Sequence, residues 1–153
     1  MEKTLVIGIG SILRGDDGVG IRVIEELRKE KFPSRVKLLS GDISGLELIK
    51  HFSGFKRIIL IDAVNIKDKP GTVKSFTNSQ IKKSNFSGIV STHGMTLLET
   101  LTIAEKLDIS PEIIIVGIQP KDISFKLGLT LEIEKKIPYI VNEVKRVINT
   151  DKK

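Results

Sequence analysis

Two aspartates and a histidine lie close to apolar segments of the chain, where their side chains could act together. Asp17 belongs to the glycine-rich stretch GIGSILRGDDGVG, Asp62 ends the apolar run RIILID, and His93 stands in STHG just before a helical pattern. Two carboxylates and one imidazole make a three-ligand set with open positions, which suits a divalent transition ion better than calcium. The dipole of the following helix keeps His93 neutral for ligation. Each residue alone has an ordinary structural explanation, but together they predict a cation site.

The glycines of the same stretch also allow a dinucleotide-binding interpretation. Gly8 and Gly10 would supply the first two glycines of G-x-G-x-x-G, but Leu13 occupies the third position. The acidic residue that holds the ribose is expected about 20 residues beyond the glycines, and Asp42 lies considerably further along. Two adjacent aspartates would also crowd a pyrophosphate at a helix N-terminus. These features disfavour the interpretation, and a nucleotide- or dinucleotide-binding α/β protein is kept only as the alternative function.

A third interpretation treats the aspartates as helix-stabilising residues. Asp16 fits the N-cap position, where a carboxylate stabilises a helix by about 0.5–2 kcal/mol. Gly18 and Gly20 would each weaken the first turns by about 1 kcal/mol relative to Ala, so stability alone does not explain the stretch. We expect the glycines to leave room for the backbone of a substrate. Asp16 is also a candidate catalytic general base, provided that its carboxylate reaches a water near the metal.

The composition is that of an ordinary globular protein with a single domain over residues 1–153. Hydrophobic residues make up 40% and charged residues 29%, and cysteine is absent, which excludes disulfides, thiolate nucleophiles and iron–sulfur ligation by this chain. The net charge of +6 comes mostly from scattered lysines without interleaved aromatic residues, a pattern that argues against nucleic-acid binding. No apolar run could span a bilayer and no secretory leader is visible, so we expect a cytoplasmic protein. We also expect a monomer, because no helical pattern leaves a spare apolar face.

Alternating strand and helix patterns predict a three-layer α/β/α fold around a mainly parallel, twisted sheet of about five strands. Strands are expected at 4–9, 35–40, 57–63, 72–76 and 112–118, the fourth being a candidate antiparallel strand after a type II turn at Pro70-Gly71. Helices are expected at 17–31, 44–53, 94–107 and 130–148, with a weak helical patch within 77–92. Ligands collect outside the carboxyl ends of the strands in such a sheet, which is where Asp17 and Asp62 stand.

The apolar spacing of each helical pattern predicts which side chains face the sheet. The residues expected to be buried are Leu46, Ile49 and Phe52 in the second helix, Met95, Leu98, Leu101 and Ala104 in the third, and Ile133, Ile137, Ile140, Val141, Val144 and Ile148 in the last. Pro138 is expected to kink the last helix or to start a new segment there.

Four segments, in this order, carry a resemblance to a known family. They are GIGSILRGDDGVG, IDAVNIKDKPGTV, STHGMTLLETL and IIIVGIQPKDISFKLGLTLEIEKKIP. The first resembles the pattern G-x-G-N-x-L-x-x-D-[DE]-G-x-G of the hydrogenase maturation proteases, and the others match that family in register. The chain resembles this family over nearly its whole length.

The resemblance implies a function and roles for the three candidate ligands. Family members are similar to endopeptidases that remove a short C-terminal extension from the large-subunit precursor of [NiFe]-hydrogenase after nickel insertion. It implies that Asp17, Asp62 and His93 contact the nickel, which the substrate's own cysteine thiolates would mainly hold. Nickel would then be a recognition handle, and whether it also polarises the scissile carbonyl or activates water is left open. Another metal-dependent hydrolase on the same scaffold is the alternative within the enzyme class.

Three further polar residues allow more than one interpretation. Ser11 stands where the family usually carries Asn, and a hydroxyl can replace the amide if the side chain only bonds local backbone. A serine-hydrolase role for Ser11 is disfavoured because the G-x-S-x-G elbow is absent. Arg14 could guide the tail or a carboxylate of the substrate, although a solvated loop arginine is the simpler interpretation. His51, next to Lys50 on the second helix, is interpreted as a surface or structural residue.

Overall fold

The sheet has five strands, all parallel but one. The computed structural model describes residues 2–83 and 97–150. The strands are β1 (Thr4–Ile9), β2 (Val36–Gly41), β3 (Arg57–Ala63), β4 (Val73–Thr77) and β5 (Glu112–Ile118). Their order is β2-β1-β3-β5-β4, with only the edge strand β4 antiparallel to its neighbour β5. The predicted mainly parallel sheet with one antiparallel strand is confirmed.

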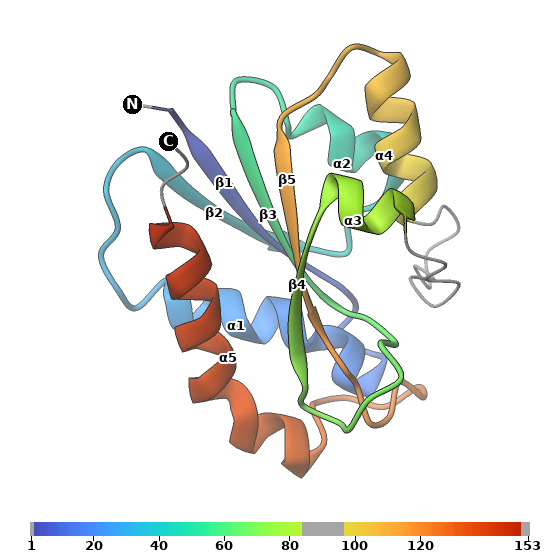
Figure 1. The fold of residues 1–153 in the computed structure, drawn as a ribbon. Helices are drawn as coiled ribbons and strands as arrows, with labels where there is room; N and C mark the ends of the chain where they lie inside the picture. Colours follow the sequence, from blue (N-terminus) through green and yellow to red (C-terminus); the bar gives the residue numbers. More distant parts are fainter. Residues whose placement is uncertain (1, 84–96, 151–153) are drawn as a thin grey trace.

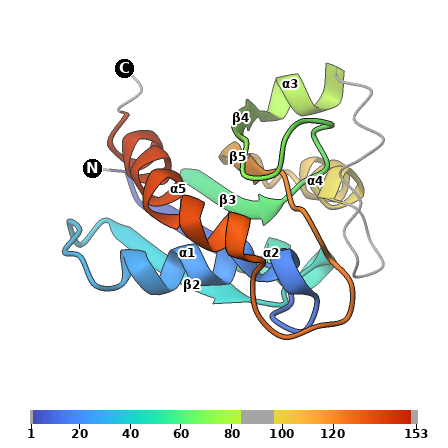
Figure 2. The ribbon, with the colours of Figure 1, turned by 90° about the horizontal axis from the view of Figure 1, so that it is seen from below.

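Helices cover both faces of this sheet, as predicted. They are α1 (Val19–Leu27), which follows the 3-10 turn η1 (Gly15–Gly18), then α2 (Gly45–Lys50), α3 (Asn78–Lys83), α4 (Leu97–Lys106) and α5 (Leu131–Asn149). Figure 1 shows α1 and α5 on one face, α2 and α4 on the other, and α3 beside the edge strand β4. The view in Figure 2 shows the same layers from below.

Each face of the sheet carries its own hydrophobic core, because alternate residues of the central strands point to opposite sides. Leu5 and Leu60 pack in the cluster under α2 and α4, whereas Val6 and Ile61 pack in the cluster under α1 and α5. The predicted buried residues of the last helix are all confirmed, namely Ile133, Ile137, Ile140, Val141, Val144 and Ile148. The strands are thus fixed from both sides, which sets the positions of their carboxyl ends.

Two predicted core leucines are wrong. Leu46 is 56% exposed and Leu98 is 39% exposed. In α2 the buried side chains are Leu48 and the predicted Ile49, and Leu46, two positions from Leu48 on the helix, points to nearly the opposite side from it. In α4 the buried side chains Leu97 and Leu101 are four apart, so Leu98 lies at the edge of their face. Met95 lies outside the described residues.

The proline predictions had mixed outcomes. Gly71 has a φ of +90° and the amide of Thr72 donates to the carbonyl of Lys69 at 3.0 Å, as the predicted type II turn requires. By contrast, no new segment starts at Pro138, because α5 runs uninterrupted from Leu131 to Asn149, and the alternative of a kink there stays a prediction. In the described parts of the chain, no helix is both long enough and apolar enough to cross a membrane.

Candidate metal-recognition site

The carboxyl ends of β1 and β3 mark the point where the strand order reverses. The chain leaves β1 for its outer neighbour β2, and β3 is followed on its other side by β5. Such a reversal opens a crevice at the ends of the two strands, where α/β proteins bind ligands. Gly8 of β1 is in register with Ile61 of β3, so Asp62 lies beside the end of β1. The sheet therefore brings the segment after β1 and Asp62 to one place.

Asp62 is partly buried, and its electrostatic environment is unfavourable to its charge. Its pKa is raised well above the ordinary value, first because burial disfavours the carboxylate and second because the negative charge of Asp17 lies nearby. A hydrogen bond with the backbone amide of Ala63 acts in the opposite direction but is the smallest contribution. The shift indicates that Asp17 and Asp62 are close and that a positive charge between them would be stabilised.

Asp17 reaches this place from η1 and is 6% exposed. Its Oδ2 accepts the backbone amide of Ser11 at 2.9 Å. The amide of Arg14 donates to the carbonyl of Ser11, and the amide of Asp17 donates to the carbonyl of Arg14, at 3.2 and 3.1 Å. These bonds close the turn between β1 and η1 and so fix where the Asp17 carboxylate lies.

Two of the three predicted ligands are brought together by the fold. Within the described residues no group of three or more His, Cys, Asp or Glu side chains is arranged to hold a metal ion, so Asp17 and Asp62 stand there as a pair. His93 lies outside the described residues, and its role as the third ligand stays a prediction. Two oxygen donors from carboxylates are suitable for a divalent cation whose remaining ligands come from elsewhere.

The comparison with known protein families decides the identity. The sequence profile of the HycI family of hydrogenase maturation proteases matches residues 21–147, which is most of the chain. This chain belongs to the hydrogenase maturation protease family.

Individual relatives agree with this assignment. The hydrogenase expression/formation protein HupD of Rhizobium leguminosarum bv. viciae is 30% identical over 151 residues, which cover 97% of this chain and 75% of HupD. The structure of the hydrogenase maturating endopeptidase HybD from E. coli has a TM-score of 0.80 and 25% identity, and the match covers 95% of this chain and 91% of HybD. The [NiFe] hydrogenase maturation protease HybD from Thermococcus kodakarensis has a TM-score of 0.75 and 28% identity, with 95% and 98% covered.

Asp16 of this maturation protease is completely buried and serves another part of the chain. Its Oδ1 accepts the amide of Thr130 at 2.7 Å, and its Oδ2 accepts the amides of Lys121 and Asp122 at 2.9 and 3.1 Å. The hydroxyl of Thr130 donates to the same carboxylate. The predicted N-cap role is wrong, because Asp16 lies inside η1 and the N-cap of α1 is Gly18. Asp16 instead fastens η1 to the segment between β5 and α5.

A catalytic role for Asp16 stays a prediction without support from these contacts. Both carboxylate oxygens accept hydrogen bonds from the protease's own backbone, so neither is turned toward a substrate in this arrangement. No sequence signal could have revealed the partners, because they are backbone amides 105 to 114 residues further along the chain. Every residue but proline carries such an amide, so composition and spacing say nothing about it.

The glycines of the opening stretch serve the protease's own packing rather than an incoming substrate backbone. A Cβ on Gly8 would lie 2.2 Å from the carbonyl oxygen of Gly20, and a Cβ on Gly20 would lie 2.4 Å from that of Ile61. A Cβ on Gly10 would lie 1.9 Å from the carbonyl oxygen of Asp17, and its φ of +148° also favours glycine. The expectation of free room is therefore wrong at these three positions.

Three further residues complete the comparison with the sequence analysis. The hydroxyl of Ser11 accepts the amide of Leu13 at 3.2 Å, which confirms that it can bond local backbone as expected. The side chain of Gln119 accepts the amide of Ile66 at 2.7 Å and so fixes the loop after β3 to the end of β5, a role that the sequence did not reveal. His51 is half-buried just after α2.

Proposed function

We propose that this maturation protease removes the C-terminal extension of a [NiFe]-hydrogenase large-subunit precursor after nickel insertion. In this proposal Asp17, Asp62 and His93 contact nickel that the precursor's thiolates hold. The observation that supports it most directly is the raised pKa of Asp62 beside Asp17, because two adjacent carboxylates in a partly buried place are unfavourable without a cation. The family and the solved structures of similar endopeptidases support the peptidase activity itself. His93 enters the proposal through its sequence motif alone.

The carboxylate pair gives the enzyme a physical means of recognising a finished precursor. A precursor without nickel offers no positive charge to Asp17 and Asp62, and burial together with the charge of Asp17 then disfavours the ionised form of Asp62. A precursor with nickel offers a cation whose open coordination positions oxygen donors can fill. Binding therefore favours the loaded precursor, and cleavage follows metal insertion. The chain has no cysteine, so it has no thiolate that could compete with those of the precursor for the metal.

The experiment is cleavage of a matched hydrogenase precursor that is either loaded with nickel or free of nickel. We expect the loss of mass of the C-terminal extension only with the loaded precursor. Asp17→Asn and Asp62→Asn should abolish cleavage while circular dichroism shows an unchanged fold. Asp42→Asn is the matched control, because Asp42 is an exposed aspartate that follows the neighbouring strand β2. Equal cleavage of both precursors by the unaltered protease would refute recognition through nickel.

A further inference from the structure

An exposed apolar surface lies beside the candidate site. Five of the ten exposed large hydrophobic side chains among the described residues come from two short segments. We call these five the apolar rim: Ile12, Leu13, Ile123, Phe125 and Leu127. Phe125 is 82% exposed and Leu127 is 75% exposed, the two highest values in the group. Burial of such a side chain is worth about 1.5–3 kcal/mol, so leaving them in solvent gives the folded protease no stability. A concentration of this kind marks an interaction site.

Hydrogen bonds join the two segments of the rim into one surface. The amide of Lys126 donates to the carbonyl of Leu13 at 2.9 Å, and the amide of Gly15 donates to the carbonyl of Lys126 at 2.8 Å. The buried carboxylate of Asp16 holds the chain at Lys121 and again at Thr130, on both sides of the rim residues. Figure 2 shows the loop between β5 and α5 running beside the segment between β1 and α1. The exposed side chains are thus carried on a fixed loop.

The rim is continuous with the candidate site. Ser11, whose amide binds the Asp17 carboxylate, directly precedes Ile12. Ile12 also lines an open pocket of about 170 Å³ together with Gly128 and Leu129, which is room for a side chain. A partner that lies on the rim therefore also reaches the neighbourhood of Asp17.

Three cations, Arg14, Lys121 and Lys126, and one acidic residue, Asp122, belong to the two segments that carry the rim. The Nε of Arg14 is buried and has no hydrogen-bond partner among the described residues. Lys126, between Phe125 and Leu127, is exposed and makes no ion pair in the described part of the chain, whereas Lys121 pairs with Glu132. Neither Arg14 nor Lys126 forms an ion pair within the described residues, so an apolar surface flanked by these two cations is complementary to an apolar segment that carries a carboxylate.

We propose that the apolar rim docks the folded body of the precursor, which rests on the proposed function. The occupant is an apolar surface segment of the precursor with a carboxylate that faces Arg14. Docking there holds the precursor in one orientation, so that its C-terminal extension reaches Asp17 and Asp62. The rim thus acts on affinity and positioning, while the cation site decides whether cleavage proceeds.

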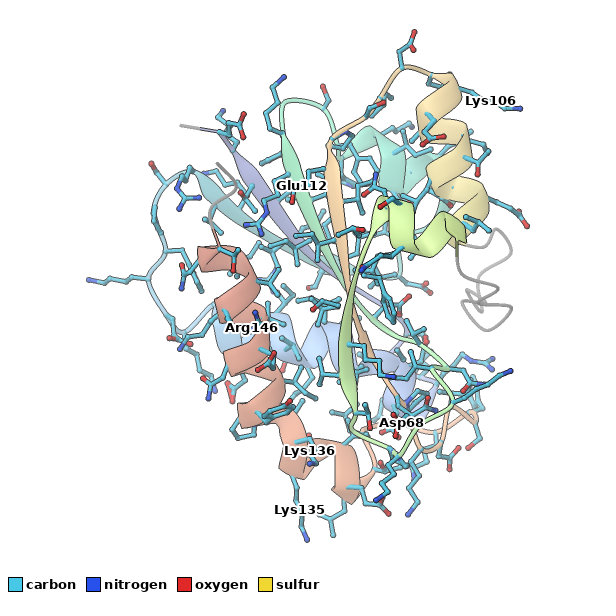
Figure 3. The ribbon with its side chains drawn as sticks, viewed as in Figure 1. Asp68, Lys106, Glu112, Lys135, Lys136 and Arg146 are labelled. Carbon is cyan, nitrogen blue, oxygen red and sulfur yellow. The ribbon has the colours of Figure 1, made fainter. Side chains whose placement is uncertain are left out.

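The test compares the double variant Phe125→Ser/Leu127→Ser with a matched control, Leu107→Ser/Tyr139→Ser. Leu107 and Tyr139 are 55% and 51% exposed. Leu107 follows Lys106, which Figure 3 labels at one end of the molecule, whereas the loop between β5 and α5 lies at the other end (Figure 1). The measurements are precursor binding by biolayer interferometry and steady-state cleavage of the nickel-loaded precursor. We expect the rim variant to weaken binding and raise KM by roughly tenfold or more, with kcat within about twofold of the unaltered enzyme. The control should match the unaltered enzyme in all three quantities.

A charge variant tests the second part of the inference. Arg14→Gln should weaken precursor binding and reduce the dependence of the affinity on ionic strength, because it removes the cation that faces the carboxylate. Unaltered binding and unaltered salt dependence in Arg14→Gln would refute the proposal that a carboxylate of the precursor faces Arg14.

The remaining outcomes separate this inference from the proposed function. If the unaltered protease cleaves the loaded precursor and the rim variant binds and cleaves equally well, the rim is not the docking surface and the proposed function stands. If the unaltered protease neither binds nor cleaves any precursor, both fail together. If sedimentation shows a dimer of the protease that Phe125→Ser/Leu127→Ser converts to monomer, a second copy covers the rim and the inference is overturned.

Discussion

Asp16 and Asp17 are adjacent aspartates, and we expect substitution of Asp16 to act mainly on stability and substitution of Asp17 mainly on activity. Asp16→Asn keeps the size of the side chain but replaces one acceptor oxygen by an NH₂ group. In the structure Oδ1 faces the amide of Thr130 and Oδ2 faces the amides of Lys121 and Asp122. Whichever way the new amide turns, its NH₂ meets at least one backbone N–H, and donors then face donors.

The cost of Asp16→Asn follows from these contacts. A hydrogen bond to a charged group contributes about 1.5–3 kcal/mol, and a buried donor left without an acceptor costs about 1–3 kcal/mol. Because such effects are not additive, we expect a loss of about 3–5 kcal/mol in the free energy of unfolding. That is a large share of the roughly 5–15 kcal/mol that stabilises a typical domain. The segment between β5 and α5 should loosen as well, since Asp16 fastens it.

Asp17→Asn should cost less, about 1–2 kcal/mol, because losing the charge-assisted bond from Ser11 is partly offset by relieving the repulsion with Asp62. The assay is urea unfolding followed by circular dichroism, together with precursor cleavage well below each variant's melting temperature. We expect Asp16→Asn to be destabilised and Asp17→Asn to be folded but inactive. An Asp16→Asn variant within about 1 kcal/mol of the unaltered enzyme, yet inactive, would refute the structural role and make Asp16 a catalytic residue.

Three other substitutions test the packing and the electrostatics. Asp62→Asn should raise the urea midpoint of the metal-free protease at pH 7. The raised pKa of Asp62 means that the folded state favours the protonated, neutral carboxyl, so the unaltered protease loses stability as the pH rises above the ordinary pKa of 3.8. The gain should shrink as the pH falls toward 3.8 with a chelator present throughout, whereas a loss at pH 7 would show that a partner stabilises the carboxylate. Gly20→Ala should lower the free energy of unfolding by about 1–3 kcal/mol, since the new Cβ would lie 2.4 Å from the carbonyl oxygen of Ile61. Gly41→Ala is the milder control in the same unfolding assay, because its Cβ would meet only a side chain, at 3.3 Å. Arg57→Met should lower the melting temperature by removing about 2–4 kcal/mol, because the guanidinium donates to the carbonyls of Val147 and Ile148 in the last turn of α5 at 2.7 and 3.1 Å. An unchanged melting temperature would contradict this.

The sequence predicted those features that depend on local pattern. Apolar runs and spacing identified all five strands and the buried face of α5, because side-chain direction repeats every two residues in a strand and every 3.6 in a helix. Asp62 could be placed at the site for the same reason, since it ends a buried strand and parallel strands share one functional edge. The errors at Leu46 and Leu98 arose where the helix is short, so that the pattern did not fix which face meets the sheet.

Only the tertiary structure decided what the two aspartates of GDDG do. Their sequence context is shared, yet one carboxylate meets backbone amides more than 100 residues away and the other meets Asp62. Backbone donors leave no mark in a sequence, and neither does the carbonyl oxygen that fills the space over Gly20. The sequence by itself thus determined that Asp17 and Asp62 follow strands whose carboxyl ends lie at one edge of the sheet. The packing of η1 against the segment between β5 and α5 determined which aspartate holds the fold and which is left for the cation.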